Sequence, residues 1–292
     1  MNTIDDVARF LEDFAPTRLA EAWDNVGLLV GDRRRPAQRV MTCLTITPST
    51  AKEAIDERAD LIVAHHPLPF TALRRLTTDT HDGRLLWDLI GAGVSIYSPH
   101  TAFDSARHGI NQRLAEGLAL VDIAPLVTGE ATPPGAGMVD ARFAGAKSDC
   151  AKSDGGSTAG GSDILGSGRC GRLAEPATLA VLAQRVKTFL SIEQLHRVGP
   201  ADRTIRRVAI ACGSGGEFLA AARQAGCECL LTGEARFHTC IEAEAAGVAL
   251  LLAGHYATER FGIERLAEVL ASRFAEISAW ASRQERDPLA WI

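Results

Sequence analysis

Histidine and carboxylate side chains recur in this sequence directly after short apolar runs. Runs of this length, rich in Val, Ile and Leu, predict buried strands. The side chains with useful chemistry at the ends of four such runs are His65 with His66, His100 with Asp104, His238, and His255 with Glu259. Ligand sites in open α/β sheets collect beyond the carboxyl ends of the strands. We therefore expect these side chains to gather at sheet edges.

Several of these residues also have an ordinary structural interpretation. A lone pair such as His65 and His66 is more often one core residue and one loop residue. Asp104 stands at the start of a helix expected over 105–118, where an N-cap role and a ligand role are equally favoured. His255 and Glu259 are four residues apart at a helix start, so they share one helical face, as metal-binding pairs do.

Imidazole and carboxylate groups in one place indicate a metal site. Mixed nitrogen and oxygen ligands suit Zn, Mn, Fe, Co or Ni. The seven cysteines show no paired spacing of the kind that binds structural zinc. A single catalytic zinc needs fewer ligands than these candidates provide. They would serve two metal ions about 3.5–4 Å apart if one carboxylate bridges the two ions. Such a pair activates water, so hydrolysis is the expected reaction class.

Strands and helices alternate along the chain, which predicts an α/β fold with mixed, mostly parallel sheets flanked by helices. The main strands are expected over 40–46, 60–64, 94–97, 206–211, 229–231 and 248–253. The main helices are expected over 4–14, 50–58, 85–91, 105–118, 177–190, 218–224 and 259–281. The expected division is one lobe of residues 1–124 plus 250–292 and a second lobe of residues 125–249. Residues 145–168, rich in Gly and Ser, are expected to form a flexible insertion.

Composition excludes several classes of protein. The net charge of -5 and the pI near 5.9 provide no basic field for a phosphate backbone, so nucleic acid is not expected as the main partner. The first residues have the pattern of an amphipathic helix, whereas a signal peptide has a basic start and an apolar core. No segment is apolar for the ~20 residues of a membrane span. We therefore expect a cytoplasmic protein without membrane partners.

Five motifs together resemble the GTP cyclohydrolase I type 2 family, also known as the NIF-three-like dinuclear-metal proteins. They are AHHPLPF at 64–70, SPHTAFD at 98–104, CGSGGEF at 212–218, LLTGEARFH at 230–238 and GHYATE at 254–259. The resemblance covers nearly the whole chain outside 131–168. It implies a two-lobed α/β subunit with the metal site at strand C-terminal ends between the lobes, two divalent metal ions per subunit, and a ring-shaped homohexamer.

Carried over by position, the resemblance implies one set of metal ligands and two further candidates. The ligands are His65, His66, Asp104, His255 and Glu259, with Glu259 as the expected bridge. His100 and His238 are left as candidates for proton transfer or for contacts that support the ligands.

Three hypotheses about function remain open on the sequence alone. The family name implies hydrolytic opening of the guanine ring of GTP. A phosphatase or phosphodiesterase would use the same ligands, because a two-metal clamp equally suits displacement at phosphorus. Phosphate binding by Arg33–Arg35, Arg74, Arg75 or Arg236 would suit both enzyme hypotheses, although three consecutive arginines are more often a solvated loop. The third hypothesis is a non-enzymatic metal-binding ring scaffold.

Overall fold

The computed structural model describes residues 1–128 and 165–290. Most of the expected 145–168 insertion lies outside the described residues, and its last two residues begin a strand. The described chain divides into two compact units, Met1–Phe103 with Arg260–Ile292, and Asp104–Glu259. The expected lobes met at 124/125 and 249/250, and that domain assignment stays a prediction. Among the described helices, none is both long and apolar enough to cross a membrane.

The first unit is built on a five-stranded sheet in the order β1-β4-β3-β2-β11. Its core strands β2, β3, β4 and β11 run parallel, and β1 pairs antiparallel at the edge. The strands are β1 (Gly27–Val30), β2 (Arg39–Cys43), β3 (Leu61–Ala64), β4 (Ser95–Ser98) and β11 (Ser278–Ala281). Helices precede or follow these strands as α1 (Ile4–Phe14), α2 (Pro48–Asp56), α3 (His81–Gly91), α4 (His100–Ser105) and α9 (His255–Arg273).

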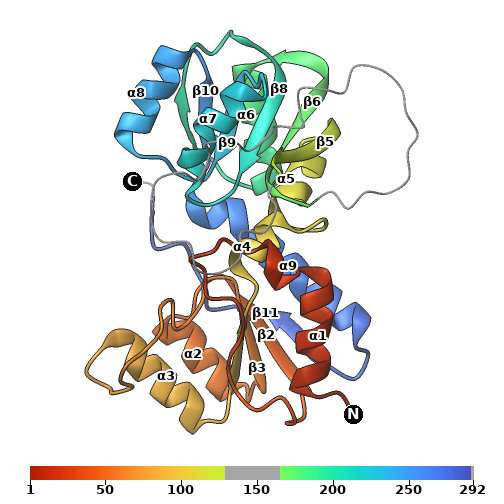
Figure 1. Cartoon of the computed structure of the whole chain (residues 1–292), viewed down its shortest axis with the longest axis vertical. Coiled ribbons are helices and arrows are strands. Elements are labelled where there is room, and N and C mark those ends of the chain that lie inside the picture. The colour runs from red at the N-terminus through yellow and green to blue at the C-terminus, as the bar shows by residue number, and fades with distance from the viewer. Residues whose placement is uncertain (129–164, 291–292) are drawn as a thin grey trace. The chain divides into compact units, whose positions relative to one another are not determined.

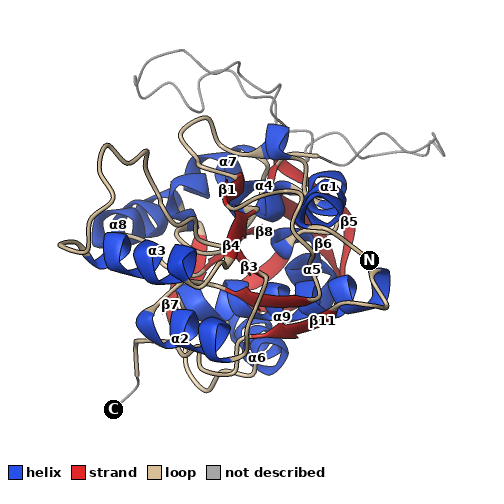
Figure 2. Cartoon of the chain, turned by 90° about the horizontal axis from the view of Figure 1, so that it is seen from below, coloured by secondary structure: helices blue, strands red, loops and turns tan. Residues whose placement is uncertain are grey.

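Helices cover both faces of this sheet. Alternate strand residues point to opposite sides, so each face has side chains that pack against helices. Met41, Ile62 and Ile96 form one buried face with apolar residues of α2 and α3, and both helices lie on the same side of the strands in the two views (Figures 1 and 2). On the other face the Thr42 hydroxyl donates to the Ile263 carbonyl of α9 at 3.0 Å. The predicted β-α-β alternation is confirmed.

The second unit contains a six-stranded mixed sheet in the order β5-β6-β8-β9-β10-β7. Its parallel centre is β8, β9 and β10. The strands are β5 (Leu120–Val127), β6 (Ser167–Thr178), β7 (His196–Val198), β8 (Thr204–Ala211), β9 (Cys229–Thr232) and β10 (Ala249–Leu252). The helices are α5 (Ile110–Gly117), α6 (Leu179–Leu190), α7 (Leu219–Gln224) and α8 (Phe237–Ala246). Apolar residues of α7 and α8 pack in one core with those of the strands.

Two expected helices differ from the structure. The last one begins at His255 and ends at Arg273, and residues 278–281 form β11, which pairs with β2. The helix expected over 105–118 is two helices, α4 and α5, and Asp104 lies inside α4. The N-cap interpretation of Asp104 is therefore wrong, because the helix around it has already begun at His100.

Buried Glu53 on α2 fastens the segment that follows β11. Its carboxylate accepts hydrogen bonds from the Ser282 hydroxyl at 2.5 Å and from the backbone N–H groups of Arg283 and Gln284 at 3.0 and 3.1 Å. Burial alone would raise the pKa of Glu53, but these donors outweigh it and the pKa is lowered. The segment so anchored continues to Glu285, which bonds the end of β2.

We predict that Glu53→Gln lowers the free energy of unfolding at pH 7 by about 1–3 kcal/mol, because a charged acceptor of several hydrogen bonds is lost. A lowered carboxylate pKa contributes stability that is present above the unfolded pKa and is lost as pH falls through the folded pKa. The difference between wild type and variant should therefore shrink in acid. Urea unfolding at pH 7 and pH 3.5 measures it, with exposed Glu268→Gln as the control. An equal difference at both pH values would contradict the assignment.

Candidate metal centre

Three histidines of the first unit form a cluster. His65 and His66 follow β3 directly, and His100 begins α4 just after β4, so neighbouring parallel strands deliver all three. One ring nitrogen from each lies within 4.8 Å of the others. The expectation for His65, His66 and His100 at strand ends therefore matches where the structure places them.

Hydrogen bonds at Nδ1 hold two of the three rings of the cluster. Asp24 Oδ1 lies 2.7 Å from His100 Nδ1, and Thr45 Oγ1 lies 2.7 Å from His66 Nδ1. In metalloproteins a ligating histidine usually bonds a carboxylate, carbonyl or other partner through its second nitrogen, which fixes the ring and its tautomer. Both contacts are made at Nδ1, so Nε2 is the nitrogen through which these rings would bind a metal ion.

Asp24 is the partner of His100 that nothing in the local sequence pattern singles out. Its side chain is fully buried, and it also accepts from the Thr101 backbone N–H at 3.2 Å and the Thr101 hydroxyl at 2.5 Å. Burial raises the pKa of Asp24. The hydrogen bond to His100, the charge of His100 and the hydrogen bonds from Thr101 lower this pKa, and the net shift is downward. The residue therefore stays ionised against His100. Its signal in the sequence, an acid in the turn before β1, is too common to be recognised alone.

Thr45 is positioned by a carboxylate from the far end of the chain. Glu285 accepts hydrogen bonds from the backbone N–H groups of Leu44 and Thr45 at 2.8 and 2.7 Å, just beyond the last residue of β2. Arg260 Nη1 lies 3.1 Å from the same carboxylate. The end of β2, and with it the hydroxyl that faces His66, is thus fixed by residues of the C-terminal segment.

The second unit carries a second group of candidates. His255 Nε2 lies 3.1 Å from Glu259 Oε2 on the first turns of α9, as their spacing predicts. Glu234 Oε1 lies 3.0 Å from His255 Nδ1, so this ring too is oriented by a carboxylate. The hydrogen bond that His255 donates to Glu259, the charge of Glu259 and the contact with Glu234 raise the pKa of His255 to about 9, although burial lowers it. A metal ion has to displace that proton to bind.

Asp104, in the same unit, receives a hydrogen bond from a buried thiol. Cys212 Sγ donates to Asp104 Oδ1 at 3.2 Å. Burial and the negative charges of Asp104 and Glu259 raise the pKa of Cys212 well above its usual range. The thiol therefore stays protonated and donates to the carboxylate.

Gly213 leaves the space that Glu259 occupies. It has φ +59°, and a Cβ built on it would lie 2.0 Å from Glu259 Oε1 and 3.3 Å from His255 Nε2. Glu259 is only 3% exposed, so its carboxylate has little room to move aside. The glycine-rich turn within the motif at 212–218 therefore admits a buried carboxylate.

His238 is placed differently from the other candidates. It lies on α8, exposed, with its ring in edge contact with Phe237 at a centroid distance of 6.0 Å. Among the described residues it does not join a group of close metal-ligand atoms. Its part in proton transfer stays a prediction.

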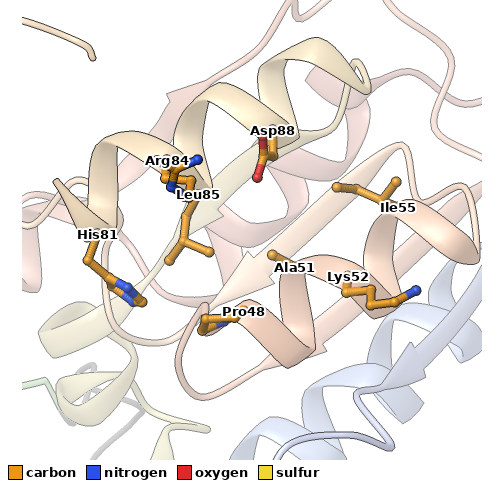
Figure 3. Close-up of a pocket in the computed structure, with 8 residues that line it drawn as sticks. All are labelled: Pro48, Ala51, Lys52, Ile55, His81, Arg84, Leu85 and Asp88. Carbon is orange, nitrogen blue, oxygen red and sulfur yellow. The ribbon is translucent and has the colours of Figure 1, made fainter. Parts of the chain in front are cut away.

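A separate cavity of about 270 Å³ lies between α2 and α3 in the first unit (Figure 3). Apolar residues and the side chains of Lys52, His81, Arg84 and Asp88 line it. Lys52 pairs with Asp56 on its own helix, and Arg84 donates to the Thr78 carbonyl at 2.8 Å. Predicted ligands do not line this cavity, so the chemistry is assigned to the histidine and carboxylate groups.

The comparisons agree with the motifs. The family model described as Duf34/NIF3 (NGG1p interacting factor 3) matches residues 2–288. The chain belongs to the Duf34/NIF3 family. A GTP cyclohydrolase 1 type 2 homolog of Clostridium acetobutylicum is 32% identical over 256 residues, covering 88% of this chain and 85% of that protein. NIF3-like protein 1 of Drosophila melanogaster is 28% identical, covering 98% of this chain and 88% of that protein.

Solved structures share the fold. A Staphylococcus aureus protein superposes with a TM-score of 0.80 at 25% identity, covering 99% of each chain. A Bacillus cereus protein related to NIF3 superposes with a TM-score of 0.79 at 22% identity, covering 100% of this chain and 99% of that one. The family resemblance and the mixed α/β fold are both confirmed.

We predict that Gly213→Ala weakens binding of a divalent metal ion at least ten-fold, because the new methyl group displaces the Glu259 carboxylate. Gly226→Ala is the matched control, since Gly226 has φ +69° and its added Cβ would have no atom within 4 Å. Each alanine should lower stability by about 1–2 kcal/mol through the left-handed backbone alone. Calorimetric titration with Zn²⁺ or Mn²⁺ measures the affinity. Equal metal affinity in the two variants would show that Gly213 does not shape the site.

Proposed function

We propose that the chain is a hydrolase that binds two divalent metal ions and acts on a nucleotide, with GTP as the first candidate. The proposed ligands are His65, His66, Asp104, His255 and Glu259. The observation that carries the proposal is the cluster of three imidazoles, two of them held at Nδ1. Relatives named GTP cyclohydrolase 1 type 2 homolog support the choice of substrate.

The five proposed ligands are assigned to one metal pair because they occupy the motifs at 64–70, 98–104 and 254–259, which carry the family resemblance. The chain passes between the units at Phe103/Asp104 and again at Glu259/Arg260, so two proposed ligands stand at the crossings. Both crossings fall inside helices, α4 and α9. Asp104 follows His100 by four residues on α4, and residues so spaced share a helical face.

The donor set fits hard to borderline divalent ions. Imidazole nitrogen and carboxylate oxygen suit Zn, Mn, Fe, Co or Ni, and the protonated thiol of Cys212 stays outside the set. When bound, such ions polarise the substrate and supply an activated water. Glu259, buried and bonded to His255, is the proposed bridging carboxylate.

Side chains of the chain itself would orient the ligating rings and carry protons near that centre. Thr45 holds the His66 ring and Glu234 holds the His255 ring, each through Nδ1. His100 is the proposed proton carrier, because its Nδ1 faces the ionised carboxylate of Asp24 and its Nε2 stays available. A histidine oriented by a buried carboxylate is the usual arrangement of a general base.

We predict about two metal equivalents per chain by elemental analysis of protein purified without chelator or a metal-affinity column. His65→Ala and Glu259→Gln should each lose metal and lower GTP turnover by about 100-fold or more, since even changes to groups that only support ligands lower activity 10–100-fold. His81→Ala, an exposed histidine on α3, is the control. Full metal content in both ligand variants would contradict the proposed site.

The same preparation separates the possible substrates. Release of formate from GTP would support ring opening, whereas release of phosphate from GTP or from simple phosphoesters would support a phosphatase or phosphodiesterase. A loaded protein that turns over neither class would support the non-enzymatic scaffold. We also propose a homohexamer, which sedimentation measures independently of activity.

A further inference from the structure

Two aromatic side chains stand at the edge of the histidine cluster and remain half exposed. Trp23 is 50% exposed and Phe70 is 49% exposed. Their ring centroids are 5.9 Å apart with a 32° angle between the planes. Each ring also meets His100 edge to face, with centroid distances of 5.9 Å for Trp23 and 6.2 Å for Phe70. The pair therefore adjoins the imidazole that the proposed function uses.

The backbone on either side of this pair is fastened. Asp24, next to Trp23, bonds His100 and Thr101, and the backbone N–H of Glu21 donates to the Thr101 hydroxyl at 3.0 Å. The Asn25 side chain donates to the Pro69 carbonyl at 2.7 Å, immediately before Phe70. The two rings come from segments 47 residues apart, and this bond joins their neighbours. They are held in place without being buried.

We infer that Trp23 and Phe70 form the surface on which the planar heteroaromatic ring of the substrate stacks. The inference rests on the proposed function, since it names the part of the nucleotide that this edge of the site would recognise. Large apolar rings kept at the surface on rigid backbone mark binding sites. Their separation and tilt bring the two rings into contact with each other, so a ligand would stack on an outer face of the pair. The position beside His100 favours a reacting ring over a remote anchor.

Stacking on an aromatic side chain recognises the π-face that every base presents, and typically changes affinity by about 5- to 150-fold when the side chain is removed. Trp23 and Phe70 have no place among the proposed metal ligands. Their loss should therefore affect ring binding while the metal content stays the same. This separates failure of the inference from failure of the proposed function.

The test uses the metal-loaded full-length protein, with GTP and guanosine as probes and ribose 5-phosphate as the probe that lacks a base. Trp23→Ala and Phe70→Ala should each raise the Kd and KM for GTP by about ten-fold or more, with a smaller effect on kcat. Trp23→Phe should restore most of the affinity. Trp87→Ala, another exposed tryptophan, is the matched control. Guanosine should quench the fluorescence of the wild type, and this quenching should be lost in Trp23→Phe.

Three results would overturn the inference. The first is an unchanged Kd for GTP in both alanine variants at normal metal content. The second is an equal loss of affinity for ribose 5-phosphate, which would mean that the ring is not what the pair recognises. The third is a changed mass in sedimentation with unchanged Kd, which would assign the pair to contacts between copies of the chain. A wild-type protein that binds no metal would instead refute the proposed function.

Discussion

The buried hydrogen bond between Asp24 and His100 is the contact on which most of the proposed site depends. It joins the turn before β1 to the first residue of α4, and the same carboxylate accepts two more bonds from Thr101. A buried carboxylate is stable only when such donors compensate for its lost hydration. The bond therefore holds the His100 ring in one orientation, and it also fixes the backbone that carries Trp23.

The same principle recurs at the other imidazoles. Thr45 contacts His66 Nδ1, and Glu234 contacts His255 Nδ1. In all three cases a side chain of another segment contacts Nδ1 and orients the ring. Parallel strands favour this arrangement, because their carboxyl ends bring short loops together at one edge while the sheet beneath stays rigid. Gly213 extends the principle to a carboxylate, since the absence of a side chain admits Glu259.

Much of the fold follows from local sequence pattern, and the failures have identifiable causes. The run Leu61–Ala64 and the helix Ile4–Phe14 show clear strand and helix periodicity, and both are confirmed. Residues 278–281 are strand because they pair with β2, which local pattern does not reveal. Asp104 was read as a possible N-cap because the short helix from His100 and the longer one from Ile110 look continuous in sequence. The structure separates them at 106–109.

The candidate site divides in the same way. Histidines after apolar runs are visible in the sequence, so His65, His66 and His100 were found. The groups that orient them were not found, because Asp24, Thr45 and Glu285 reach the site from distant parts of the chain and carry no local signal. Gly213 appears in the sequence only as one residue of the motif at 212–218, because its role depends on Glu259, which is 46 positions later.

The central claim is that the five proposed ligands bind one pair of metal ions. The most direct measurement is a crystal structure of the metal-loaded protein with anomalous diffraction collected at the edge of the metal found by elemental analysis. The account predicts two anomalous peaks about 3.5–4 Å apart. It also predicts that His65, His66, Asp104, His255 and Glu259 lie about 2.0–2.2 Å from one or both peaks. A single peak bound by residues of one unit, with the others remote from it, would contradict the claim.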